Sequence, residues 1–173
     1  MRVRLERTVE LEGARLRLRD WPGTRGPLVH VPDPLSPGDV LVETLAASSA
    51  ADARVISVEP RAGYPYQIQA ADLHATLAQF GFATPVLVGE RLGCVAALLV
   101  AAWFPDAVSK LVLVDPTYAA SPECTGSIEA RALHDCPPDW PSVRTAVRCP
   151  ILEIRWTNAA LAVTNLQAFL RLP

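Results

Sequence analysis

Five residues between two apolar runs could carry chemistry: two glycines flank three other residues in the stretch Gly89-Glu90-Arg91-Leu92-Gly93. The run before them, Val86–Val88, is short and β-branched, which predicts a buried strand. The apolar segment Cys94–Phe104 after them is long enough for a buried helix. An arginine at the centre of this turn stays protonated and only donates hydrogen bonds. It can bind an anion or pair with a carboxylate, but it cannot attack a carbonyl.

A second apolar run, Leu111–Val114, follows the helix and ends at Asp115-Pro116. Two such strands flanking a helix predict a right-handed parallel crossover. This unit resembles the core of the α/β-hydrolase superfamily, in which a sharp strand-to-helix turn carries Gly-x-nucleophile-x-Gly. The resemblance implies that Arg91 occupies the nucleophile position, and therefore a hydrolase fold without hydrolase chemistry.

The rest of the chain predicts the elements that position this turn. Residues Val3–Val9 and Ala14–Arg19 alternate apolar and charged side chains around Glu12-Gly13, which predicts an antiparallel hairpin. The other predicted strands are Leu28–Val31, Val55–Val58 and Ile151–Ile154, and the other predicted helices are Asp39–Ala47 (capped near Ser36), Gln69–Phe80, Ser142–Val147 and about Ala160–Leu170.

This order of elements matches the α/β-hydrolase sheet from its first strand through its seventh, so the resemblance covers essentially the whole chain. We expect one α/β domain over residues 1–173, with a mostly parallel α/β-hydrolase-like sheet, an N-terminal antiparallel hairpin and helices on both faces. The resemblance implies two missing pieces. Only turn-rich chain up to Pro141 stands where the family usually inserts a cap domain, and the last strand, the eighth, would begin beyond Pro173.

The other catalytic parts that the resemblance implies are altered as well. The base would come from the missing eighth strand, and neither His74 nor His134 stands in its place. The turn that usually carries the acid reads Arg155–Ala159 and holds no carboxylate. Asp115 could serve as an acid instead, but an Asp before Pro is more typical of a turn.

One of the two oxyanion donors of the family is also altered. His30-Val31 occupies the place of a His-Gly pair, so Pro32, which has no N–H, falls on the first donor position. The second donor, the N–H of Leu92, is expected to remain. The residue before the nucleophile, commonly His in the family, is Glu90.

Composition limits the function classes. Half of the 173 residues are apolar and the net charge is −2, which offers no field for nucleic acid or an anionic membrane. The four cysteines show no metal-ligand spacing, and Cys94–Phe104 is too short to span a bilayer. We therefore expect a reduced, cytoplasmic protein with no metal and no cofactor.

The first functional hypothesis is a pseudo-hydrolase that binds a small anionic ligand or a partner above the strand ends, where open α/β sheets bind ligands and a helix N-terminus attracts anions. The candidate ligand-binding residues are Arg91, Glu90, His30, Asp33, Glu59 and Asp115. The alternative for Arg91 is an internal ion pair with Glu59, Glu90 or Asp115. We favour that ion pair, because one charge-assisted hydrogen bond is worth about 1.5–3 kcal/mol and exceeds the cost of a cation at a helix N-terminus.

Two further hypotheses remain open. One is an esterase-like hydrolase with a non-standard centre, such as Cys94 or Ser36 working with His134, although Cys94 falls where a small core residue is usual. The other is a truncated product or one half of a two-chain assembly. Without an eighth strand, Ile151–Ile154 would be an exposed apolar edge, so we expect a homodimer or a second chain to cover it.

Overall fold

The computed structural model describes residues 3–35, 38–48, 53–61, 63–116, 140–157 and 159–171. The described residues form a seven-stranded sheet in the order β1-β2-β4-β3-β5-β6-β7. The strands are β1 (Leu5–Leu11), β2 (Ala14–Trp21), β3 (Arg25–Val31), β4 (Ala53–Val58), β5 (Val86–Glu90), β6 (Lys110–Val114) and β7 (Ile151–Ile154). The helices are α1 (Val40–Ser48), α2 (Tyr66–Gln79), α3 (Gly93–Trp103), α5 (Trp140–Ala146) and α6 (Ala159–Arg171), with a 3₁₀ turn η1 (Pro105–Ala107).

The sheet is antiparallel at one end and parallel over the rest. β1 pairs with β2, and β2 with β4, in antiparallel fashion. The pairs β3–β4, β3–β5, β5–β6 and β6–β7 are parallel. Gly13 forms the hairpin turn with a φ of 73°, a conformation that glycine adopts at little cost. The predicted mostly parallel sheet with an N-terminal hairpin is confirmed.

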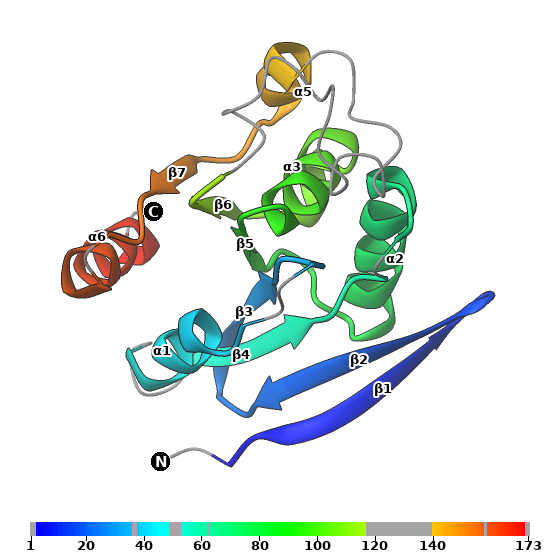
Figure 1. Ribbon diagram of the computed structural model, residues 1–173, viewed down its shortest axis with the longest axis horizontal. Helices are drawn as coiled ribbons and strands as arrows, with labels where there is room; N and C mark the ends of the chain where they lie inside the picture. Colours follow the sequence, from blue (N-terminus) through cyan, green and yellow to red (C-terminus); the bar gives the residue numbers. More distant parts are fainter. Residues whose placement is uncertain are drawn as a thin grey trace.

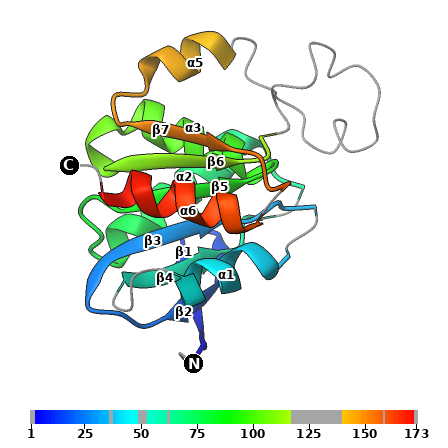
Figure 2. The same ribbon diagram turned by 90° about the vertical axis from the view of Figure 1, so that its left-hand side faces the viewer.

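Helices cover both faces of the sheet, as predicted (Figures 1 and 2). Successive strand residues point to opposite faces, so each parallel strand contributes to two apolar cores. One core lies under α2 and α3 and contains Val29, Ile56, Leu87 and Leu111. The other lies under α1 and α6 and contains Leu28, Val55, Val88 and Val112.

Helix α2 begins earlier than its apolar pattern predicts. The predicted helix started at Gln69, whereas the observed one starts at Tyr66, directly after Pro65. A proline before the first turn needs no N–H partner, so it starts the helix rather than prolonging the loop. At the other end Gly81 has a φ of 67°, and the N–H groups of Gly81 and Phe82 donate to the carbonyls of Ala78 and Leu77. These two bonds form a Schellman motif, which ends the helix within one residue of its predicted end at Phe80.

Several sequence predictions fall on residues that are not described. Ser36 and His134 lie outside the described ranges, as does most of the turn-rich chain predicted in place of a cap. No cap domain appears among the described residues. β7 is the outermost strand of the described sheet, and association through that edge stays a prediction. No helix within the described ranges is long and apolar enough to cross a membrane.

Candidate functional site

The Gly89–Gly93 stretch forms a sharp turn from β5 into α3. Arg91, at its centre, has a φ of 49°. An arginine with positive φ is uncommon and costs on the order of 1–3 kcal/mol, so the surrounding structure must enforce it. The Arg91 N–H donates to the carbonyl of Val114 at 2.8 Å, which ties the turn to the end of β6. The strand, turn and helix predicted from the sequence are therefore present, with arginine in the strained position.

Packing explains both glycines of the turn. A Cβ on Gly89 would lie 2.6 Å from the Cα of Cys94. A Cβ on Gly93 would lie 2.2 Å from the carbonyl oxygen of Val31 and 2.5 Å from that of Pro32. Real Cβ atoms do not approach backbone atoms so closely, so the start of α3 fits against the end of β3 only when residue 93 is glycine.

The side chain of Arg91 pairs with Asp33, which follows β3. Arg91 Nε donates to Asp33 Oδ2 at 2.9 Å. Asp33 is almost fully buried, at 3% exposure of its side chain, whereas the Arg91 side chain is 57% exposed. The other carboxylate oxygen of Asp33 accepts the N–H of Leu35 at 3.0 Å. The two Nη groups of Arg91 have no hydrogen-bond partner in the described part of the chain.

The predicted ion pair of Arg91 therefore exists, but its predicted partners were wrong. Glu59 is held by Arg17 and Arg19 of β2, at 3.2 and 3.1 Å.

The two remaining predicted partners are engaged as well. Glu90 contacts His30 at 3.2 Å, and Asp115 accepts the N–H of Trp156 at 3.0 Å. Asp33 lies on the loop that packs against the Gly89–Gly93 turn, called the elbow below, because β3 neighbours β5 in the sheet. The sequence alone did not place Asp33 against Arg91.

A buried polar chain runs beneath the elbow. The Nε2 atom of His30 lies 3.2 Å from Glu90 Oε2, and its Nδ1 atom lies 3.1 Å from Ser57 Oγ. An ionised carboxylate only accepts, so Nε2 carries the proton and Nδ1 accepts the Ser57 hydroxyl. Burial lowers the pKa of His30, an effect that Glu90 opposes and that the positive charge of Arg19 adds to. His30 is thus a neutral ring at pH 7.

The residues Ser57, His30 and Glu90 have the atoms of a Ser-His-carboxylate relay, but a substrate cannot reach them as hydrolysis requires. Ser57 and His30 are both completely buried, so no ester carbonyl can approach the hydroxyl. The order of contacts also places the hydroxyl on Nδ1 and the carboxylate on Nε2. These three side chains satisfy one another's hydrogen bonds inside the sheet, and this arrangement does not activate the Ser57 hydroxyl as a nucleophile.

Sequence reasoning missed two residues of this region. Ser57 is a polar residue within the apolar end of a strand, and this was the signal that could have identified it. In the sheet it lies directly opposite His30, across β4 and β3. Arg19 was predicted only as the last residue of the hairpin's alternating pattern, but its side chain is only 7% exposed and pairs with Asp39 and Glu59. Its Nε has no partner in the described structure. The side chain is held there by the carboxylates of Asp39, just before α1, and of Glu59, just after β4.

Cys94 is not a reactive thiol. It is fully buried at the start of α3, and its Sγ donates to the carbonyl of Val114 at 3.6 Å. Burial raises the pKa of this thiol far above its usual value, so the thiolate needed for attack does not form. The described residues also bring together no group of three or more side chains that could hold a metal ion.

The comparisons with known proteins identify the fold. No protein-family model matches the sequence, and no curated protein matches it at a significant level. Solved structures do match. Epoxide hydrolase A from Mycobacterium thermoresistibile is similar over 65% of this chain and 39% of its own, with 22% identity and a TM-score of 0.56. A putative lipase from Acinetobacter baumannii AYE is similar over 65% and 42%, with 16% identity and a TM-score of 0.59.

A thioesterase domain from the curacin biosynthetic pathway is similar over 65% of this chain and 44% of its own, with 18% identity and a TM-score of 0.57. This chain thus matches less than half the length of each of these three proteins. At such identities the likeness concerns the fold alone. The sheet order, the turn at Arg91 and these neighbours together show that the chain has the α/β-hydrolase fold.

Proposed function

We propose that this protein is a catalytically inactive member of its fold that binds a small anionic ligand at the elbow. The observation that carries this proposal is the placement of Arg91. Its backbone occupies the strained central position of the elbow, its side chain is 57% exposed, and only Nε is engaged. A guanidinium with both Nη groups available matches a carboxylate or a phosphate.

The loss of catalysis is supported by three separate features. Arginine cannot act as the nucleophile. The nearby thiol of Cys94 and hydroxyl of Ser57 are both fully buried. Pro32, which has no N–H, lies directly against the start of α3, where the first oxyanion donor was expected.

Asp33 shapes the ligand site and limits its affinity. The carboxylate orients the guanidinium through Nε and neutralises part of its charge, so an anion joins an existing pair instead of meeting a bare cation. The N–H of Leu92, at the start of α3, has no partner among the described residues and adds a second donor. We expect weak, salt-sensitive binding of compact anions.

The catalytic half of the proposal is tested with a fluorophosphonate probe and a p-nitrophenyl ester. The purified protein should neither be labelled nor turn over the ester, and Arg91→Ser should not restore turnover because the base and one oxyanion donor are still absent. Stoichiometric labelling of any serine would contradict the proposal. It would favour a hydrolase with a non-standard centre that uses residues such as Ser36 and His134.

The binding half is tested by titrating inorganic phosphate and acetate at constant ionic strength while following the amide signals of Leu92 and Gly93 by NMR. Arg91→Gln should abolish the saturable shifts, and Arg91→Lys should weaken them because lysine lacks the two-donor edge. Arg15→Gln, an exposed arginine of the hairpin paired with Glu10, is the matched control and should leave binding unchanged. Shifts that persist in Arg91→Gln would refute an anion site at this residue.

A further inference from the structure

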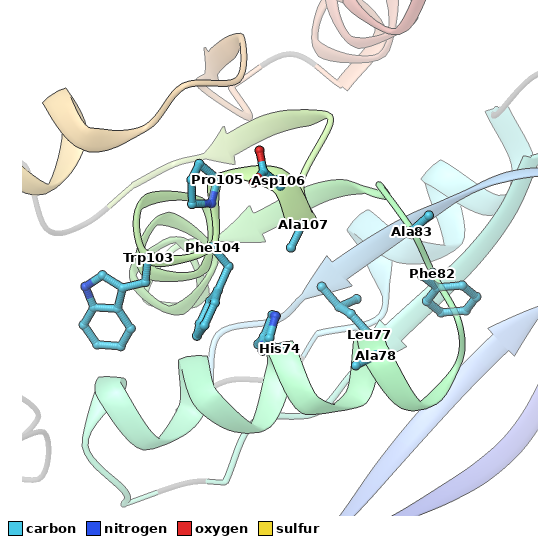
Figure 3. A pocket seen from close by; sticks show the side chains of 10 residues that line it. All are labelled: His74, Leu77, Ala78, Phe82, Ala83, Trp103, Phe104, Pro105, Asp106 and Ala107. Carbon is cyan, nitrogen blue, oxygen red and sulfur yellow. The ribbon is translucent and has the colours of Figure 1, made fainter.

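A groove lies at the far end of α3, away from the elbow. It has a volume of about 510 Å³, within the range of small-molecule sites. The last turns of α2 and α3, η1 and the loop after α2 form its walls (Figure 3). Because α3 rises about 1.5 Å per residue, this groove is roughly 15 Å from Arg91 and is a separate site.

Aromatic rings dominate the groove. The rings of His74 and Phe104 are stacked, with centroids 3.6 Å apart and an angle of 7° between their planes. Trp103 lies at one end of the groove and is 47% exposed, a large fraction for this residue. Figure 3 shows the ring of His74 between the two helices, and neither of its nitrogens has a hydrogen-bond partner in the described structure. The groove thus presents aromatic faces and two ring nitrogens without a hydrogen-bond partner among the described residues.

The electrostatics of the groove favour a cation. Both α2 and α3 end here, and neither has a basic residue in its last turn to offset the negative end of its dipole. Asp106 lies at the rim, on the η1 side. No Lys or Arg is among the described residues that line the groove. Arg54, which lies over the ring of Phe82, is neutralised by a two-bond pair with Asp20.

We propose that this groove binds a small organic cation, an ammonium ion with an aromatic or branched apolar body. The apolar body would lie against the side of Phe104 that faces away from His74, and the ammonium would face the ring of Trp103, since indole is the strongest aromatic partner for a cation. Other arginines of this chain already stack on aromatic rings, as Arg61 does on Tyr64 at 4.2 Å. The ring of Trp103 has no such partner among the described cations.

The test uses three probes of similar size and different charge: benzyltrimethylammonium, benzyl alcohol and benzenesulfonate. Affinities are measured by ligand-detected NMR at constant ionic strength. We expect saturable, millimolar binding of the ammonium ion, about threefold or more tighter than that of benzyl alcohol, and no saturable binding of the sulfonate. Equal affinity for the ammonium ion and the alcohol, or preference for the sulfonate, would overturn the proposal.

Four variants locate the binding. Trp103→Leu keeps an apolar side chain and should weaken the ammonium ion about threefold or more, with less effect on benzyl alcohol. Asp106→Asn should weaken it about twofold through the loss of one charge. The matched controls are Tyr64→Leu, an exposed aromatic outside the groove, and Glu12→Gln, an exposed carboxylate of the hairpin turn. If Trp103→Leu, shown to be folded by its unfolding midpoint, binds the ammonium ion as tightly as the parent, the groove is not the site.

Discussion

Strands β5 and β6 end in the same backbone turn with different side-chain surroundings. Arg91 after β5 has a φ of 49°, and Asp115 after β6 has a φ of 46°. Each donates its N–H, at 2.8 Å, to the last residue of the next strand in the sheet, Val114 and Ile154 respectively. The same backbone turn therefore occurs at the ends of two neighbouring strands of the sheet.

The two turns differ in what holds them. Asp115 tolerates positive φ, and its carboxylate accepts the N–H of Trp156, so the residue itself supports its turn. The Arg91 side chain bonds Asp33 instead of the neighbouring strand end, and a Cβ at Gly89 or Gly93 would meet backbone atoms of the adjoining turn and of β3. The elbow geometry thus depends on its glycines and tolerates a change of side chain at position 91. The shape of this turn therefore does not require a particular side chain at position 91.

The strongest test of this difference is Gly93→Ala. The added Cβ would meet two carbonyl oxygens of the β3 loop, and we expect a loss of about 3 kcal/mol or more in the free energy of unfolding. Gly81→Ala is the control, since it has a positive φ but nothing within 4 Å of the added carbon, and it should cost about 1–2 kcal/mol. Urea unfolding measures both. A loss for Gly93→Ala no larger than that for Gly81→Ala would show that the close approach of α3 to β3 does not make this glycine necessary.

The β6 turn should respond to its own residue. Asp115→Ala removes the acceptor of the Trp156 N–H and places alanine at positive φ, and we expect a loss of about 2 kcal/mol. Asp115→Asn keeps an acceptor oxygen and tolerates the conformation, so it should lose less than about 1 kcal/mol. Chemical denaturation of the two variants measures both losses. Identical losses for Asp115→Ala and Asp115→Asn would show that the side chain of Asp115 does not stabilise the turn.

Only the elbow has a titrating group beneath it, among the residues described. The pKa of His30 is lowered from 6.5 by burial, so between pH 6.5 and its lower folded-state pKa the unfolded chain binds more protons. Stability is fully present above pH 6.5 and falls as the pH falls through that window. The free energy of unfolding, measured with denaturant at several pH values across this range, should depend less on pH for His30→Gln than for the parent. An unchanged slope would show that His30 is not the group responsible.

The smallest effect is expected at Arg91 itself. Arg91→Asn relieves the strain of positive φ but removes an ion pair whose arginine is largely exposed, and such pairs contribute little. The two effects oppose each other, so we expect a net change within about 1 kcal/mol. If thermal and urea unfolding show a larger loss than for Asp115→Ala, the ion pair with Asp33 holds the elbow and the glycines do not.

Most of the fold was predictable because its strands are short apolar runs and its turns contain glycine or proline. The elbow followed from two glycines at the right spacing. The bounds of α3 and β6 were predicted within one residue, and β5 extends two residues further, to Glu90, than its predicted end at Val88. The site was harder, because its contacts join strands that are distant in sequence. Asp33 meets Arg91, and Ser57 meets His30, only after β3 is inserted between β4 and β5.

The position of β4 in the sheet has a consequence for how fast the protein folds. The chain passes directly from β2 to β3, yet β4 separates them in the sheet and pairs with both. The hairpin can form early from local contacts, but it cannot join the parallel strands until Ala53–Val58 has followed α1 into the gap. Closure of such non-local pairs is slow. We therefore expect the insertion of β4 to limit the folding rate, and chains caught before it to aggregate through the open strand edges.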